Sequence, residues 1–129
     1  TPEFTKSLYM ITPNETEANA MTGIKIKDLR DVKKAARKLL GSGSQYVLIT
    51  MGANGVYLAS QNDDFEYIPS PKVTTIDSTA AGDCFNGTLA VSLSQGLSVF
   101  EAAKKACRAA SISVTRKGAQ DSMPFINEL

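Results

Sequence analysis

The part of the chain with the most obvious chemical potential is residues 77–83, which read DSTAAGD. A long apolar segment follows, so we expect these residues to lead into a helix. Small side chains at Ala80, Ala81 and Gly82 would leave the first N–H groups of that helix uncovered. Such groups, together with the helix dipole, attract anions. A phosphoryl group in transfer is an anion that this arrangement would stabilise.

Asp83 falls in the first turn of the expected helix, where the dipole stabilises a carboxylate. Such a carboxylate could accept the proton of an attacking hydroxyl. Phosphoryl transfer needs little more from side chains, because positioning and charge stabilisation supply most of the catalysis. An ordinary helix that begins with an aspartate explains the same letters, and the heptapeptide alone does not separate the two interpretations.

Asn14 and Glu17 form a second candidate site near the start of the chain. They are three residues apart in sequence, so a helix would place them on one face. Both carry side-chain oxygens that suit a hydrated Mg²⁺. Helix capping and surface exposure explain the same two residues, and taken alone the two residues favour this structural interpretation.

The third candidate is the segment TMGANG at residues 50–55, which follows an apolar run. Its glycines could let the backbone approach a nucleotide, although a hairpin turn needs glycines too. Neither the P-loop pattern G-x-x-x-x-G-K-[ST] nor a full G-x-G-x-x-G occurs in the sequence. A phosphotransferase built on this chain would therefore be of a type without a P-loop.

Strands and helices must alternate to position these residues. The pattern predicts an α/β sandwich with a mostly parallel sheet, helices on both faces, and antiparallel pairing within residues 46–68. For the first helix, Thr12, Pro13 and Glu15 fit an N-cap, a first helical residue and a capping-box partner. The helix after Asp83 is apolar on nearly every side, which predicts a central, buried helix. We expect strands at 7–11, 46–50, 56–60, 65–68 and 72–76, and further helices at 28–40 and from Ser98 to about Val114.

Composition narrows the class of protein. The 129 residues correspond to one domain or part of one, and the start at Thr1 suggests a piece of a longer protein. A net charge of +1 argues against nucleic-acid binding. Histidine is absent, which excludes Ser-His-Asp nucleophiles and histidine-bound metals. Two cysteines and no long apolar run predict a cytoplasmic protein without a membrane partner.

Three blocks in this order resemble the PfkB carbohydrate kinase family: TPNETEA at 12–18, STAAGDCFNG at 78–87 and VTRKGAQ at 114–120. The resemblance covers essentially the whole chain and corresponds to the C-terminal half of a ribokinase-like three-layer α/β sandwich. It implies ATP-dependent phosphorylation of a sugar hydroxyl, with D-ribose and its 5-phosphate as the first expectation. A kinase for another sugar or a nucleoside, and a catalytically silent module that binds nucleotide or a partner, remain the alternatives.

The resemblance also implies roles for individual residues. Asp83 would be the general base, and the N–H groups of the segment that includes Ala81 and Gly82 would form the anion hole. Asn14 and Glu17 match an N-x-x-E motif that organises Mg²⁺ and phosphate, and Cys107 falls at the adenine end of ATP. The ATP site would further include Thr50, Met51, Gly52, Ala53, Asn54 and Gly55. The positions that match a loop site for an activating monovalent cation, usually K⁺, are Asp77, Thr79, Ser113, Arg116, Gly118 and Ser122.

Family members are more than twice as long as this chain. Their N-terminal half, which is absent here, supplies the lid and nearly all the side chains that recognise the sugar, and the full-length protein is expected to be a homodimer. Residues 1–129 should therefore keep the nucleotide half-site and the base. Because alignment of the reacting hydroxyl contributes much of the rate, we expect the chain alone to be a very poor kinase.

Overall fold

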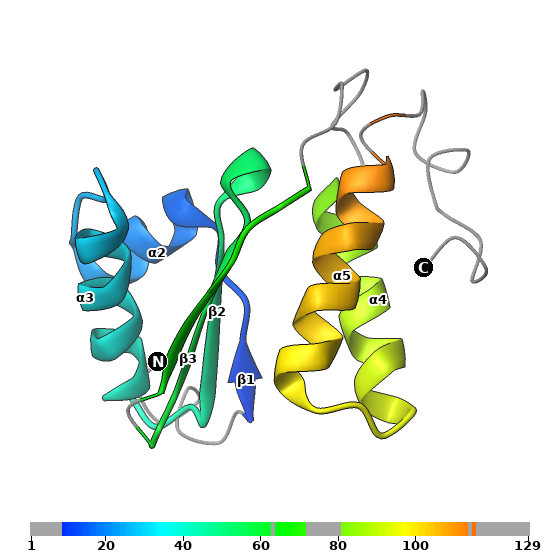
Figure 1. Ribbon diagram of the computed structural model, residues 1–129. Helices are drawn as coiled ribbons and strands as arrows, with labels where there is room; N and C mark the ends of the chain where they lie inside the picture. Colours follow the sequence, from blue (N-terminus) through cyan, green and yellow to red (C-terminus); the bar gives the residue numbers. More distant parts are fainter. Residues whose placement is uncertain (1–8, 63, 72–80, 114, 116–129) are drawn as a thin grey trace. The chain divides into compact units, whose positions relative to one another are not determined.

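The computed structural model describes residues 9–62, 64–71, 81–113 and 115. The chain divides into two compact units, residues 1–67 and 68–129 (Figure 1). The first unit contains two helices and the strands, except for the last residue of the final strand, and the second contains the last two helices. In chain order the elements are β1 (Met10–Ile11), α2 (Glu15–Thr22), α3 (Leu29–Leu40), β2 (Tyr46–Thr50), the 3₁₀ turn η1 (Gly52–Asn54), β3 (Val56–Ser60), β4 (Phe65–Ile68), α4 (Ala81–Ser94) and α5 (Val99–Ser113).

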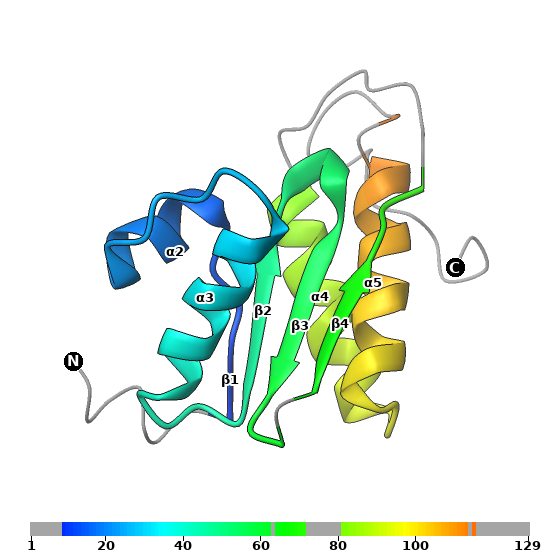
Figure 2. The same cartoon turned by 60° about the vertical axis from the view of Figure 1, so that its left-hand side comes forward.

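The strands form one mixed sheet in the order β1-β2-β3-β4. β1 pairs with β2 in parallel, with Met10 opposite Tyr46, and β2 pairs with β3 in antiparallel fashion. Helices α2 and α3 connect the parallel pair and lie on the same side of the sheet (Figure 2). The strands predicted at 46–50, 56–60 and 65–68 are confirmed. The strand predicted at 7–11 is described only as Met10–Ile11, and the one predicted at 72–76 lies outside the described residues.

Helix α3 supplies most of the helical side of the first unit's core. Apart from Leu29 at its start, its apolar residues recur at helical spacing and are buried, while lysines and arginines occupy the other face. Asp28 caps the helix, because its carboxylate accepts hydrogen bonds from the N–H groups of Arg30 and Asp31. The N–H bond from Asp31 and the contact with Arg30 lower the pKa of that carboxyl. The core joins Val32, Ala35, Ala36, Leu39 and Leu40 of α3 to Val47, Ile49, Tyr57 and Ala59 of the sheet.

Helix α2 begins two residues later than the sequence predicts. Its N-cap is Asn14, not Thr12, and the capping-box partner is Glu17, not Glu15. The reason is that the chain stays extended beyond β1, where the carbonyl of Pro13 accepts a hydrogen bond from the N–H of Thr50 at 3.0 Å. Sheet pairing therefore uses the residues that local capping preferences would have placed in the helix.

In the second unit, α4 and α5 lie side by side (Figures 1 and 2). The helix predicted from Ser98 is confirmed as α5, and the N–H of Glu101 donates to the Ser98 hydroxyl at its start at 3.2 Å. The prediction that α4 is buried on nearly every side is wrong. Phe85 and Leu89 are buried, but Ala90 is exposed and Val91 is 55% exposed. A helix buries only the faces for which neighbours are present, and one face of α4 lacks them in the described chain.

The core of the first unit can be tested at Ile49, which is fully buried in β2. We expect Ile49→Ala to lower the free energy of unfolding by about 3 kcal/mol, because it removes buried methyl groups and leaves a cavity. Urea unfolding followed by circular dichroism measures this. Leu29→Ala is the control, since Leu29 is 47% exposed, and it should change stability by less than about 0.5 kcal/mol. Equal effects of the two substitutions would contradict the assigned core.

Candidate functional site

Two of the three candidate segments meet at the carboxyl ends of the parallel strands. Asn14 follows β1 and Thr50 ends β2, and these two residues form a parallel bridge. The hydrogen bond from Thr50 N–H to the Pro13 carbonyl fixes the same contact. In open α/β sheets, ligands bind beyond the carboxyl ends of the strands. The structure thus brings the N-x-x-E segment and the start of the TMGANG segment to the edge of the sheet where a ligand is expected.

Asn14 and Glu17 form a complete capping box. The N–H of Glu17 donates to Asn14 Oδ1 at 2.7 Å, and the N–H of Asn14 donates to Glu17 Oε1 at 3.0 Å. Helix capping therefore does account for the presence of these two residues. Both side chains are nevertheless exposed. The box uses one oxygen of each residue, so the Asn14 amide nitrogen and Glu17 Oε2 are the atoms best placed to meet a ligand.

Residues 50–55 form a tight turn that links β2 to β3. Gly52 and Gly55 both have positive φ, +56° and +93°, a conformation that side chains rarely allow. The turn closes through hydrogen bonds from Met51 N–H to the Gly55 carbonyl at 2.8 Å and from Gly55 N–H to the Gly52 carbonyl at 3.1 Å. The hairpin accounts for the glycines. The turn begins beside Asn14. The backbone at Gly52 is open to its surroundings, because a Cβ there would meet nothing within 4 Å.

The third candidate segment lies in the second unit, at the start of α4. Ala81 is the first helical residue, and Gly82 and Asp83 in the first turn are both exposed. A Cβ built on Gly82 would meet no atom within 4 Å. The described side chains therefore leave this helix start accessible. Ala80 lies outside the described residues.

The predicted cation loop is represented by one residue among those described. Ser113 is buried at the end of α5, where its hydroxyl donates to the Ala110 carbonyl at 2.8 Å. Within the described ranges, His, Cys, Asp and Glu side chains form no group of three that could hold a metal ion. The remaining predicted positions, Asp77, Thr79, Arg116, Gly118 and Ser122, lie outside the described residues.

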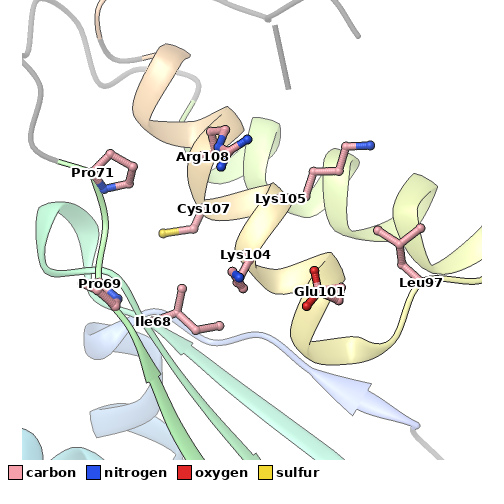
Figure 3. A pocket seen from close by; sticks show the side chains of 9 residues that line it. All are labelled: Ile68, Pro69, Pro71, Leu97, Glu101, Lys104, Lys105, Cys107 and Arg108. Atoms are coloured by element: carbon pink, nitrogen blue, oxygen red, sulfur yellow. The ribbon is translucent and has the colours of Figure 1, made fainter. Parts of the chain in front are cut away.

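Cys107 borders a cavity of about 380 Å³ in the second unit. Figure 3 shows its thiol directed from α5 toward the segment that carries Pro69 and Pro71. Only 5% of Cys107 is exposed, and burial raises the pKa of its thiol, an effect that a hydrogen bond with Ser70 partly offsets. The walls combine apolar and charged residues: Ile68, Pro69, Pro71, Leu97, Glu101, Lys104, Lys105, Cys107 and Arg108.

Sequence reasoning found Cys107 but missed the other residues of this cavity. Glu101, Lys104, Lys105 and Arg108 are spaced i, i+3, i+4 and i+7, so they share one face of α5. This spacing could have predicted that one side of the cavity is charged. The Pro-Ser-Pro segment opposite carried no comparable signal, because only the tertiary structure brings it to α5.

Comparisons with known proteins come from both sequence and structure. The model of the pfkB family of carbohydrate kinases matches residues 3–126. A ribokinase of Haemophilus influenzae is 43% identical over 126 residues, and a ribokinase of Staphylococcus aureus is 37% identical over 128. Both matches take in 98% of this chain but only 41% and 42% of the relatives. The chain thus spans about two fifths of the length of the curated relatives it matches.

Solved ribokinase structures share the fold. The Thermotoga maritima enzyme superposes with a TM-score of 0.89 at 41% identity, covering 99% of this chain and 43% of that one. The Arabidopsis thaliana enzyme, complexed with ribose and ATP, superposes with a TM-score of 0.92 at 32% identity, covering 99% and 41%. The predicted ribokinase-like α/β fold is confirmed. Among the described residues, none of the helices has the length and hydrophobicity needed to cross a membrane.

The two cysteines provide a test of the second unit. Cys84 and Cys107 are both buried free thiols, and burial raises the pKa of each above the usual value. A raised pKa leaves less thiolate near neutral pH, and thiolate is the reacting form. We expect alkylation by iodoacetamide at about pH 7 to be at least about tenfold slower than in the urea-unfolded chain. Mass spectrometry measures the rates, and equal rates would show that the thiols are accessible in the folded chain.

Proposed function

The chain belongs to the pfkB family of carbohydrate kinases, and we propose that it carries the ATP-binding and catalytic part of a sugar kinase that converts D-ribose to ribose 5-phosphate. The observation that carries this proposal is the first turn of α4, where Gly82 and the acid Asp83 are both exposed and a Cβ on Gly82 would meet nothing within 4 Å. The matches to ribokinases support the acceptor, and the A. thaliana relative was solved with ribose and ATP.

Asp83 would act as the general base. As the sugar oxygen attacks the γ-phosphorus, the carboxylate would take the hydroxyl proton, and ADP would leave from the opposite side of the phosphoryl group. The N–H groups of Ala80, Ala81 and Gly82 would hold the negative oxygens of the group in transfer. A module that only binds nucleotide has no need of an exposed acid at this place, which favours the enzymatic interpretation.

The edge formed by β1 and β2 would bind the phosphate end of ATP in the first unit. The Asn14 amide nitrogen can donate to a phosphate oxygen, and Glu17 Oε2 can accept from a metal-bound water, while the capping box keeps both side chains oriented. Mg²⁺, when bound, neutralises charge on the phosphates. The donor set is compatible with this indirect role, since Mg²⁺ usually keeps several of its waters.

The cavity beside Cys107 supports the position proposed for the adenine end of ATP. Its volume of about 380 Å³ falls within the range of roughly 300–1,000 Å³ that small-molecule pockets occupy. Ile68, Pro69 and Pro71 offer apolar surface, as a flat base requires. The ATP-binding turn would contribute backbone from Thr50 to Gly55. Activation by K⁺ at the loop positions named above belongs to the same proposal and rests on the family resemblance.

Two further properties belong to this proposal. We place the protein in the cytoplasm, where two buried, unpaired thiols remain reduced. We also propose that the full-length protein is a homodimer, as the family resemblance implies.

The general base can be tested in a chimera. We would replace the segment of the H. influenzae ribokinase that this chain matches with residues 1–129, and measure ribose-dependent ADP release. We expect the chimera to be active, and Asp83→Asn to lower kcat by about 10³, because it removes the base while preserving the side-chain shape. Calorimetry should show unchanged ATP binding in the variant. An active Asp83→Asn chimera would rule out the assigned base.

The 129-residue chain by itself should release ADP in response to ribose at least about 10³-fold more slowly than the chimera, because nothing aligns the sugar hydroxyl with the phosphate. A coupled ADP-release assay on both proteins at equal concentration makes the comparison. Turnover by the chain alone near that of the chimera would mean that these residues suffice to bind the sugar.

A further inference from the structure

Tyr67 connects the last strand of the sheet to the turn at residues 50–55. Its hydroxyl donates to the backbone carbonyl of Asn54 at 2.5 Å. Asn54 is the last residue of η1, whereas Tyr67 lies in β4, 13 residues further along the chain. The Tyr67 residue is 44% exposed. The β-propensity of an aromatic ring would explain phenylalanine at this place equally well, so the hydroxyl and its hydrogen bond need a reason of their own.

The sheet brings the two residues together. β4 is the neighbour of β3, and only residues 61–64 connect the two strands, which is too short a link for parallel strands. The strands therefore run in opposite directions, and the end of β4 lies beside the start of β3 (Figure 2). Val56 begins β3 directly after the 50–55 turn. Tyr67, the last residue but one of β4, is thus close to the turn.

Phe65 anchors β4 within the first unit. Phe65 and Tyr67 are two residues apart in the strand, so their side chains emerge on the same face of the sheet. The Phe65 ring lies near the Tyr57 ring, with centroids 6.0 Å apart. From α3, Lys33 Nζ and Arg37 Cζ lie over the Phe65 ring, 4.8 and 5.2 Å from its centroid, an attractive arrangement. Tyr67 therefore reaches the turn from a strand that is itself held in place.

The Tyr67 hydrogen bond restrains a peptide unit that the turn holds only from one side. The Asn54 carbonyl and the Gly55 N–H belong to the same planar peptide. Within the turn, the N–H donates to the Gly52 carbonyl at 3.1 Å. Among the described residues, the backbone bonds inside the turn use the carbonyls of Met51, Gly52 and Gly55. Tyr67 adds the restraint on the carbonyl of Asn54.

We propose that Tyr67 is a positioning residue for ATP, because its hydroxyl holds the 50–55 turn in the conformation that binds the nucleotide. The two glycines of the turn allow its backbone other conformations. A site that adopts its binding conformation only part of the time binds more weakly, in proportion to the populated fraction. The inference rests on the proposed function, since that proposal assigns ATP to the turn.

Kinetics of the chimera described above test the inference. We expect Tyr67→Phe to raise KM for ATP by about threefold, because loss of a neutral hydrogen bond lowers the fraction of turn in the binding conformation. The values of kcat and of KM for ribose should stay unchanged, as expected when ATP binding is weakened equally in the ground and transition states. Tyr9→Phe is the matched control. It removes the hydroxyl of a tyrosine that is 51% exposed just before β1, and it should change none of the three constants.

Hydrogen exchange in the 129-residue chain tests the turn directly. The Gly55 N–H should exchange about fivefold faster in Tyr67→Phe than in the unchanged chain, because the opening of the turn loses one opposing hydrogen bond. Faster exchange with an unchanged KM for ATP would overturn the inference, because the turn would then open without consequence for the nucleotide. Unchanged exchange would also overturn it, as would a lower kcat with an unchanged KM for ATP.

Calorimetric titration with ATP separates this inference from the proposed function. An inactive chimera that still binds ATP, and binds it more weakly after Tyr67→Phe, would contradict the kinase assignment and leave the role of Tyr67 intact. An active chimera whose KM for ATP does not respond to Tyr67→Phe would reject that role and leave the kinase assignment intact. A chimera that is inactive and binds no ATP would reject both.

Discussion

Parallel pairing of β1 with β2 is the constraint on which the arrangement of the first unit depends. Two parallel strands cannot be joined by a tight hairpin, so the chain must cross over, and α2 with α3 forms that crossover. The pairing also places the residues after both strands at one edge. The Pro13 carbonyl and the Thr50 N–H close this edge directly. Asn14 and the 50–55 turn are neighbours for that reason, although 36 residue positions separate Asn14 from Thr50 in the sequence.

The capping box shows how a structural role and a ligand role can share the same residues. Asn14 and Glu17 each bind the other's backbone N–H, which satisfies two groups that a helix start would leave unpaired. These bonds also hold the two side chains in fixed positions at the ligand edge. A site whose side chains are already oriented loses less conformational entropy when it binds. The structural explanation for Asn14 and Glu17 therefore does not compete with the proposed function but strengthens it.

The local hydrophobic pattern of the sequence was sufficient to predict an element where one physical effect, the burial of apolar side chains, dominated. The burial pattern of α3 and the apolar run of β2 follow directly from sequence periodicity, and both elements were predicted almost to the residue. Prediction failed at Thr12 because sheet pairing with β2 outcompeted a good local cap. The prediction that α4 is buried failed at Val91. Hydrophobic residues show which faces a helix can bury, but actual burial depends on which neighbours are present. The cavity beside Cys107 could not be predicted, since it requires Pro69 and Pro71 to lie opposite α5.

Packing within the second unit bears on the chemistry proposed for α4. Cys84, Phe85 and Leu89 are buried, and α4 lies beside α5. Cys84 and Phe85 directly follow Asp83 in the sequence, so their burial fixes the axis of α4 at its first turn. An error of about 1 Å in alignment can cost about 10²-fold in rate. The role proposed for Asp83 therefore requires the packing of α4 as well as the acid itself.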